Sequence, residues 1–231
     1  MDRKLRKKIQ EHEDAHWWFV SRRLVLDKIL NNFLPHTKNR RDILEIGCGS
    51  GGNLQMLQTH GNLSAIELDE PSRRTANSRN ICIVKKGELP DDIPFDIQFD
   101  VICAFDVLEH IDDDLLALQS IKNRLKENGT LLVTVPAYNF LWAPHDDFNQ
   151  HRRRYTKKQL IETVLNAPLK IEYSTYFNTF LFPFMAPYRI FTKFVAGNNS
   201  MSVSQPPVLL EYVLKNIFSA ERRFLPSITF P

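Results

Sequence analysis

The sequence has few cysteines, and they follow no pairing pattern. Its three cysteines, Cys48, Cys82 and Cys103, lie in apolar or glycine-rich stretches and form no C-x-x-C pair. An odd number of cysteines without a secretion signal is typical of reduced, buried thiols in the cytoplasm. The charged beginning, Met1–Lys8, lacks the apolar segment of a signal peptide. We therefore expect a cytoplasmic protein.

Long apolar runs and a strong net charge are also absent. No uncharged run is long enough to span a bilayer. The formal net charge of +3 over 231 residues is too small by itself to indicate a nucleic-acid partner. Internal repeats and low-complexity linkers are missing, and the length suits one domain with an appended lobe. The composition is that of an ordinary soluble globular protein.

Glycine is scarce, but half of it lies in one turn. Four of the eight glycines follow the apolar run Ile43–Ile46 and precede a predicted helix that starts near Asn53; they are Gly47, Gly49, Gly51 and Gly52. Glycine has no Cβ, so the backbone N–H groups of such a turn can approach a ligand closely. A strand, a glycine turn and a helix N-terminus together predict a nucleotide or cofactor site.

The glycine spacing is compatible with two cofactors. Gly47, Gly49 and Gly52 fit G-x-G-x-x-G, and Glu67 lies 20 residues after Gly47, where a dinucleotide site has its ribose acid. Glu45 argues against NAD, because a carboxylate at the tip of the first strand repels a pyrophosphate and suits a cationic ligand. An NAD(P)-dependent oxidoreductase therefore stays the alternative among enzymes.

Several motifs resemble those of the class I S-adenosylmethionine (SAM)-dependent methyltransferases. Glu45–Gly51 matches their first motif, acid-x-G-x-G-x-G, and the D-V-L-E-H block Asp106–His110 follows a predicted fourth strand. H-W-W-F at His16–Phe19 and H-R-R-R-Y-T at His151–Thr156 resemble a largely uncharacterised bacterial subgroup. The resemblance covers roughly residues 40–176. It implies SAM as cofactor and S-adenosylhomocysteine as product.

The resemblance also implies roles for residues at the strand ends. Glu67 is expected to accept hydrogen bonds from both ribose hydroxyls, Leu68 to cover the adenine, and Glu88 to accept from the adenine amine. Arg22 or Arg23, in a lid before the first strand, is expected to meet the methionine carboxylate. The predicted cofactor-binding residues are Arg22, Glu45, Gly47, Cys48, Gly49, Gly51, Asn53, Glu67, Leu68, Gly87, Glu88, Leu89, Phe105, Asp106, Val107 and His110.

Alternating strand and helix patterns predict an α/β fold with a doubly wound, mostly parallel sheet of the Rossmann-like, class I methyltransferase type. The predicted strands cover residues 43–46, 63–66, 81–84, 99–105, 130–135 and 169–176. We expect a helical lid over 1–36, a SAM-binding domain over 37–176, and an apolar C-terminal cap and helix over 177–231. Class I methyltransferases normally finish with a seventh, antiparallel strand, and the proline-rich end over 225–231 is too short to supply a full one.

Three consecutive acids, Asp112–Asp114, could look like metal ligands. They precede the apolar start of a predicted helix at Leu115, where negative charge is favoured by the helix dipole. That helix is expected to reach Lys126 and to end at Asn128 in a left-handed cap. We therefore expect no metal at these acids.

The polar-aromatic segment Ala137–Tyr155 is where we expect the methyl acceptor. Methyl transfer needs alignment and exclusion of water, and an oxygen or nitrogen acceptor can also need a base. The predicted catalytic residues are His145, Asp146 and His151, with Asp146 or Asp147 orienting one histidine. The predicted substrate-binding residues are Trp18, Tyr138, Trp142, Arg154 and Tyr155. Purely structural roles stay open for these residues, including a solvated arginine run ahead of a helix cap at Thr156.

The segment 177–191 is rich in aromatic residues but is not a simple spanning helix, because it holds Pro183, Pro187 and Arg189. A cap over the acceptor pocket and an interfacial segment that meets lipid both stay open, and both suit an apolar acceptor. We expect methyl transfer by direct displacement to a small, apolar or anionic-tagged acceptor. A non-catalytic SAM-binding protein is the alternative from another class.

Overall fold

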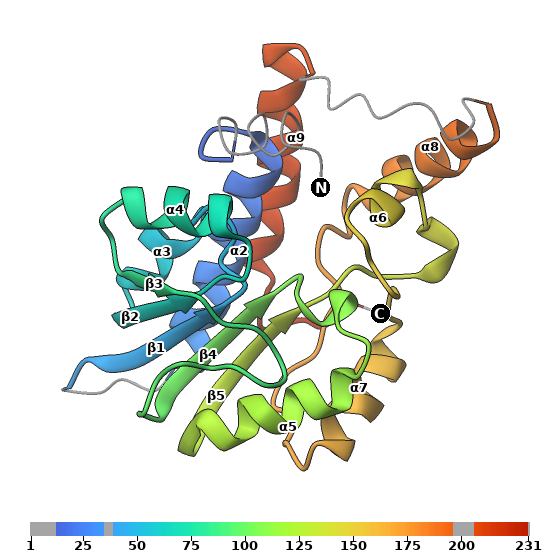
Figure 1. Ribbon diagram of the computed structural model, residues 1–231. Helices are drawn as coiled ribbons and strands as arrows, with labels where there is room; N and C mark the ends of the chain where they lie inside the picture. Colours follow the sequence, from blue (N-terminus) through green and yellow to red (C-terminus); the bar gives the residue numbers. More distant parts are fainter. Residues whose placement is uncertain (1–12, 35–38, 196–205, 231) are drawn as a thin grey trace.

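The computed structural model describes residues 13–34, 39–195 and 206–230 (Figure 1). Its sheet has five parallel strands in the order β3-β2-β1-β4-β5. The strands are β1 (Arg41–Ile46), β2 (Gly61–Ile66), β3 (Ile83–Lys85), β4 (Phe99–Phe105) and β5 (Leu125–Thr134). The order reverses between β1 and β4, which is the doubly wound arrangement predicted, and ligands bind at such a switch point.

Helices cover both faces of the sheet. They are α2 (Trp17–Phe33), α3 (Leu54–Gln58), α4 (Glu70–Ser78), α5 (Asp114–Arg124), α6 (Pro144–Phe148), α7 (Lys157–Asn166), α8 (Phe182–Val195) and α9 (Val208–Ala220), with 3-10 turns η1 (Leu108–His110), η2 (Asn139–Leu141) and η4 (Glu221–Arg223). Within the described ranges no helix is both long and apolar enough to cross a bilayer.

Helix starts follow the predicted caps. Asp113 is the N-cap of α5, and its side chain accepts a hydrogen bond from the backbone N–H of Leu116. Thr156 caps α7 in a capping box with Gln159. The acids before α5 therefore serve a helix start, as expected. The helix itself ends at Arg124, and Asn128 takes its left-handed φ of 61° inside β5 instead of at a helix end.

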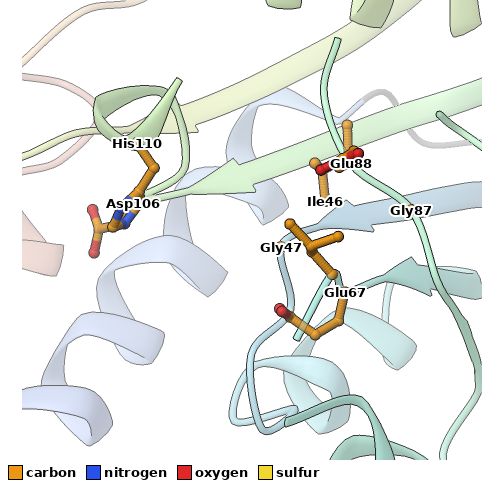
Figure 2. Close-up of a pocket in the computed structure, with 8 residues that line it drawn as sticks. Ile46, Gly47, Glu67, Gly87, Glu88, Asp106 and His110 are labelled. Carbon is orange, nitrogen blue, oxygen red and sulfur yellow. The ribbon is translucent and has the colours of Figure 1, made fainter. Parts of the chain in front are cut away.

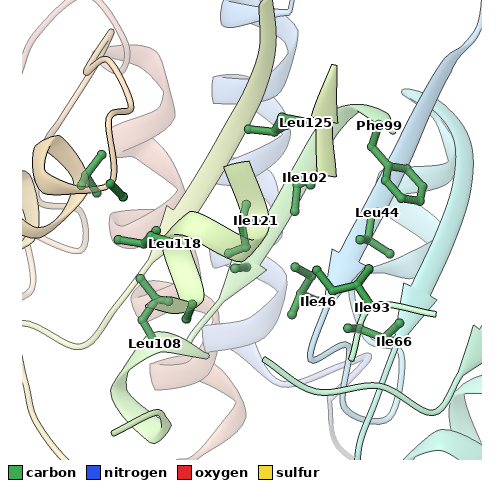
Figure 3. Close-up of a cluster of buried hydrophobic side chains, with 14 of the residues drawn as sticks. Leu44, Ile46, Ile66, Ile93, Phe99, Ile102, Leu108, Leu118, Ile121 and Leu125 are labelled. Carbon is green, nitrogen blue, oxygen red and sulfur yellow. The ribbon is translucent and has the colours of Figure 1, made fainter. Parts of the chain in front are cut away.

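Successive side chains along each strand point to opposite faces of the sheet, so the core has one layer on each face. Ile43 of β1 packs with Leu26 and Leu30 of α2 on one face. On the other face, Ile102 of β4 packs with Leu118 and Ile121 of α5 (Figure 3). Full burial of one such side chain contributes about 1.5–3 kcal/mol. The two layers hold the carboxyl ends of the strands in place.

Helix α9 lies beside α2 (Figure 1). Trp17 and Val25 of α2 share a cluster with Phe218 of α9. The C-terminal helix and the N-terminal lid helix thus form one structure, although they are far apart in the sequence.

The prediction of a sixth strand over residues 169–176 is wrong. This segment makes only an isolated antiparallel bridge, between Tyr176 and Phe230. The ring of Tyr173 packs on Phe33 with centroids 4.9 Å apart, and its hydroxyl donates to the carbonyl of Ile228 at 3.1 Å. The aromatic residues that suggested a strand therefore hold the C-terminal tail and α2.

Parts of the predicted lid and of the predicted C-terminal cap fall outside the described residues, namely 1–12, 35–36, 196–205 and 231. In the described part, the lid helix starts at Trp17, where the ring of His16 accepts from the backbone N–H of Trp18 at 3.3 Å.

Candidate functional site

The glycine turn between β1 and α3 depends on a left-handed backbone. The φ angle of Gly47 is 68°, which L side chains rarely adopt. A Cβ on Gly47 would also lie 2.8 Å from a methyl carbon of Val107. Glycine is required here both for the torsion and for the close approach of the loop after β4, as the first motif predicts.

A cavity of about 270 Å³ lies beyond the carboxyl ends of the strands (Figure 2). Seven of its eight lining residues are in the predicted cofactor set, and Ile46 is the exception; the predicted seven are Gly47, Glu67, Leu68, Gly87, Glu88, Asp106 and His110. They come from the segments after β1, β2, β3 and β4. The cavity therefore lies at the switch point where the fold predicts a ligand.

Glu67 is fixed by backbone donors at the cavity wall. Its two carboxylate oxygens accept from the backbone N–H groups of Gly49 at 2.8 Å and of Asp69 at 2.7 Å. Burial raises the pKa of Glu67 even though these bonds oppose the shift. The carboxylate is oriented toward the cavity before any ligand binds (Figure 2).

Glu45 lies behind the glycine turn and does not line the cavity. One of its oxygens accepts from Asn53 Nδ2 at 2.9 Å, and the other has no hydrogen-bond partner in the described part of the chain. The residue is only 1% exposed, and burial raises its pKa to about 8. Glu45 therefore lies near the turn on the face of the sheet that α2 covers, and burial favours its protonated form until a positive charge lies beside it.

Glu13 was missed by the sequence analysis. Its carboxylate accepts from the Ser50 hydroxyl and lies against Gly52, and Arg23 donates to its backbone carbonyl at 3.2 Å. Burial raises the pKa of Glu13 as well. The segment before α2 therefore lies on the glycine turn, where a lid was predicted, but no periodicity or motif around Glu13 signals this contact.

Arg22 ties α2 to the tips of β4 and β5. Its guanidinium pairs with Asp106 at 2.8 Å and donates to the Thr134 hydroxyl at 2.6 Å. Its central carbon lies 5.9 Å from the centre of the Phe105 ring. Asp106 has a φ of 55°, a left-handed conformation that often marks functional sites. Arg22 thus adjoins the cavity wall through Asp106.

On the acceptor side, Asp146 orients His151. The Nδ1 atom of His151 donates to Asp146 Oδ1 at 2.9 Å, and Arg154 donates to the same carboxylate at 2.9 and 3.1 Å. Burial alone would raise the pKa of Asp146, but these bonds outweigh it and hold the pKa well below its usual range. The rings of His151 and His110 meet edge-on with centroids 4.8 Å apart, which links this cluster to the cavity wall.

The electrostatics of the site favour a cation. Burial raises the pKa of three carboxyl groups around the cavity and the turn, Glu13, Glu45 and Glu67. Each would ionise more readily beside a positive charge. A ligand with an ammonium and a sulfonium supplies that charge, whereas a pyrophosphate adds repulsion.

Comparison with known proteins agrees with this chemistry. The profile of the methyltransferase domain family matches residues 17–173, more than half of the chain. The chain belongs to this family. The cofactor of this methyltransferase domain is SAM, as predicted from Glu45–Gly51, rather than the nicotinamide cofactor of the alternative.

Curated relatives of the methyltransferase domain are distant. A probable SAM-dependent methyltransferase of Mycolicibacterium smegmatis is 25% identical over 165 residues, covering 69% of this chain and 62% of that protein. One of Mycobacterium tuberculosis is 26% identical over 133 residues, covering 55% of this chain and 46% of that protein. The chain thus spans less than two thirds of the length of these relatives.

Solved structures confirm the fold. A SAM-dependent methyltransferase of Thermotoga maritima, described as a possible histamine N-methyltransferase, has a TM-score of 0.55 at 22% identity, covering 72% of this chain and 79% of that one. A chain from the complex of the Haloferax volcanii Trm112 methyltransferase activator with a putative methyltransferase has a TM-score of 0.60 at 19% identity, covering 76% and 78%.

The other predicted cofactor residues of the methyltransferase domain are not among the residues that line the cavity. Cys48 is buried, and its Sγ faces the carbonyl of Gly49 at 3.8 Å. Leu89 and Val107 pack against the core on the α5 face. Their predicted contacts with SAM stay predictions.

Among the predicted substrate-binding residues, three have structural partners. Arg154 is buried and divides its donors between Asp146 and the carbonyl of Ala137. Tyr155 is buried, and its hydroxyl donates to Asp114 at 2.7 Å. Trp18 packs on Phe218 with ring centroids 5.0 Å apart. Their roles in substrate binding stay predictions.

Tyr138 and Trp142 lie in the segment after β5. The ring of Tyr138 stacks on Tyr176 with centroids 4.9 Å apart, and Trp142 Nε1 donates to Asp147 at 3.0 Å. His145, the second predicted catalytic histidine, hydrogen-bonds Asn149 at 2.8 Å. None of the predicted acceptor-side residues lines the described cavity, so their functional roles stay predictions.

Proposed function

We propose that this domain transfers a methyl group from SAM to a small, apolar or anionic-tagged acceptor by direct displacement. The observation that carries the proposal is the gathering of buried carboxyl groups at the glycine turn and at the wall of the adjoining cavity. An acceptor atom forms a bond to the methyl carbon while the carbon–sulfur bond breaks toward sulfur. The protein's tasks are alignment and exclusion of water.

The acceptor side is supported by a chain of contacts that leads away from the cavity. His110 lines the cavity and touches His151, which Asp146 orients. A carboxylate that fixes one nitrogen of an imidazole leaves the other nitrogen free to take a proton. This arrangement favours His151 over His145 as the base for an oxygen or nitrogen acceptor.

The proposed acceptor class follows from the same region. Asp146 also pairs with Arg189 of α8 at 3.3 Å, so α8 adjoins the acceptor side. Rings of Tyr138, Tyr176 and Phe182 meet near it. Arg189 supports an anionic tag and the aromatic rings support an apolar body.

We also propose work in the cytoplasm with peripheral membrane contact through 177–191, and no nucleic-acid partner. The cytoplasmic setting is supported by the free thiols of all three cysteines. Membrane contact is supported by exposed aromatic residues on α8, where Phe184 is 72%, Tyr188 65% and Phe191 64% exposed. The small net charge supports a small-molecule acceptor rather than nucleic acid.

Calorimetry followed by methyl transfer tests the proposal. We expect SAM and S-adenosylhomocysteine to bind with a stoichiometry near one and NAD not to bind. Labelled methyl from SAM should then appear in a small molecule of a bacterial extract and not in its protein or nucleic acid. Binding of NAD would contradict the proposal. Binding of SAM without transfer to any fraction would favour the non-catalytic alternative.

A further inference from the structure

Glu109 is a buried carboxylate to which methyl transfer, as proposed, assigns no role. It lies in η1, directly after β4, and its exposed fraction is 0%. Neither of its carboxylate oxygens has a hydrogen-bond partner in the described part of the chain. An unpartnered buried carboxylate costs several kcal/mol when ionised, so its retention at this point needs an explanation.

Two imidazoles surround this carboxylate. His110 is the next residue in η1, and His151 arrives from the segment after α6. A carboxylate oxygen of Glu109 and one ring nitrogen of each histidine all lie within 4.8 Å of one another. His110 also lines the cavity, as Figure 2 shows, so the group adjoins the proposed site of methyl transfer.

Each imidazole ring also lies beside a hydrogen-bond acceptor that can hold a metal-binding histidine in place. His151 Nδ1 donates to Asp146 at 2.9 Å, so Nε2 is the nitrogen left to bind an ion. The ring of His110 faces the backbone of Asn149 and Gln150. Histidines that bind metals almost always donate their other N–H to a carboxylate or a backbone carbonyl.

We propose that Glu109, His110 and His151 bind one divalent transition-metal ion of the Zn²⁺ type, with a coordination position open to the cavity. Two imidazoles and one carboxylate are a donor set typical of such ions in catalytic sites. Donor atoms about 2.1 Å from Zn²⁺ lie at most about 4.2 Å apart. The observed spread of up to 4.8 Å closes with small rotations of the side chains.

The open position supplies a role in the reaction, and this part rests on the proposed methyl transfer. A metal-bound hydroxyl loses its proton near neutral pH. The proton passes to solvent, the acceptor oxygen forms a bond to the methyl carbon, and the carbon–sulfur bond breaks with its electron pair going to sulfur. The acceptor is then a hydroxyl compound. With the ion bound, the ion replaces His151 as the group that promotes loss of the acceptor's proton, and His151 is the base only in metal-free protein.

Calorimetric titration of EDTA-treated protein with Zn²⁺ tests the site. We expect one ion per chain, and affinity at least about tenfold weaker in Glu109→Gln and in His151→Gln. His60→Gln is the matched control, because His60 lies just before β2 at the opposite end of the sheet and pairs with Asp27 at 2.8 Å. Its affinity for Zn²⁺ should equal that of the wild type. Co²⁺ should give visible d–d absorption that Glu109→Gln removes.

Folding is checked by thermal melts of the metal-free variants. Glu109→Gln removes an unpartnered carboxyl group and should stay folded, so a loss of Zn²⁺ binding in that variant reports on the site. Any of three results would overturn the site. They are unchanged Zn²⁺ affinity in both variants, no stoichiometric Zn²⁺ binding by the wild type, and a loss of Zn²⁺ affinity in His60→Gln equal to that in the two variants.

The same samples separate the two proposals. Metal-free protein that still transfers methyl at the full rate overturns the metal's role and leaves methyl transfer standing. SAM affinity of Glu109→Gln should stay within about twofold of wild type, because Glu109 does not line the cavity. The opposite result is also possible: the wild type binds one Zn²⁺ ion, these variants bind it more weakly, and no acceptor receives a methyl group. That result supports the metal site and contradicts the proposed methyl transfer.

Discussion

Single carboxylates set the chemistry at the tips of β1 and β2. Glu67 points into the cavity on two backbone hydrogen bonds, whereas Glu45 lies behind the glycine turn with one oxygen unpaired within the described ranges. Both carry a pKa raised by burial. Their different positions lead to different expectations, one for ligand affinity and one for stability.

Replacing Glu67 should weaken SAM binding. Loss of a charged hydrogen-bond acceptor costs about 1–3 kcal/mol, which is roughly 5- to 150-fold in the dissociation constant. Calorimetry of Glu67→Ala measures it. Glu70→Ala is the control, because Glu70 lies nearby in α4, is exposed and pairs with the exposed Arg74. Equal affinity in Glu67→Ala and wild type would rule out the ribose role.

Replacing Glu45 should change how stability depends on pH. Its pKa rises from the ordinary 4.5 to about 8 on folding, so between these values the folded protein holds a proton that the unfolded chain releases. The free energy of unfolding should therefore fall by up to about 1.4 kcal/mol per pH unit as the pH rises through this window. In Glu45→Gln this contribution is absent.

Urea unfolding of both proteins from pH 5 to pH 8.5 measures the difference. Other buried acids make the free energy of unfolding depend on pH equally in both proteins. The difference between the two curves of unfolding free energy against pH therefore reports on Glu45 alone. We expect Glu45→Gln to gain stability relative to wild type as the pH rises. Parallel curves would mean that Glu45 is ionised in the folded protein throughout the range.

At the scale of helices and loops, one buried carboxylate, Asp146, joins the segments of the acceptor side. Asp146 of α6 is buried and accepts hydrogen bonds from His151, Arg154 and Arg189 of α8. Arg153 pairs with Asp114 at the start of α5 at 3.1 Å. The arginine run that the sequence offered as a solvated face or an anion site is thus mainly a set of ties between elements.

Breaking a buried ion pair between these elements should destabilise the fold more than breaking an exposed pair. Arg154→Met leaves Asp146 short of its bidentate partner, and removal of one member of a buried pair costs about 3–5 kcal/mol. Arg152→Met is the matched control, because Arg152 is 55% exposed and pairs with the exposed Asp112; exposed pairs contribute about 0–1 kcal/mol. Urea denaturation compares the two, and equal losses would contradict the structural role of Arg154.

Across the whole molecule, apolar surface is concentrated on α8 and on the first turns of α9. Besides the aromatic residues of α8, Val208, Leu209 and Tyr212 of α9 are exposed. Both helices come from the C-terminal region, and the first turns of α9 are at the end of that helix farther from the sheet (Figure 1). An exposed apolar patch of this kind is typical of a lipid or protein contact.

If the patch meets lipid, removing its aromatic residues should release the protein from membranes. We expect Phe184→Ser with Phe191→Ser to reduce co-sedimentation with phosphatidylcholine–phosphatidylglycerol vesicles by about tenfold or more, since each buried Phe contributes about 1.5–3 kcal/mol. The control is Ile83→Ser with Ile97→Ser, two exposed apolar residues away from α8. No binding of the wild type to vesicles would contradict the membrane proposal and favour a cap.

The predictions succeeded where local physics decides structure. β4 was predicted with its observed bounds because Phe99–Phe105 is apolar except for Asp100, and the glycine turn required its torsions whatever packed around it. β3 is shifted and shorter, at Ile83–Lys85. The strand expected over 169–176 failed because its aromatic residues pack on α2 and the C-terminal tail, a preference that no local pattern reveals.

The sequence by itself determined the parallel sheet, the glycine turn and the row of acids at the strand ends, and through them the SAM cofactor. These features depend on backbone torsions, alternation and the direction of parallel strands, all of which are encoded over a few residues. Only the tertiary structure decided that Arg154 and Tyr155 turn inward, that Glu13 lies on the turn, and that His151 meets Glu109 and His110. Those contacts join residues far apart in the chain, so they exist only once the packed core has set the distances between elements.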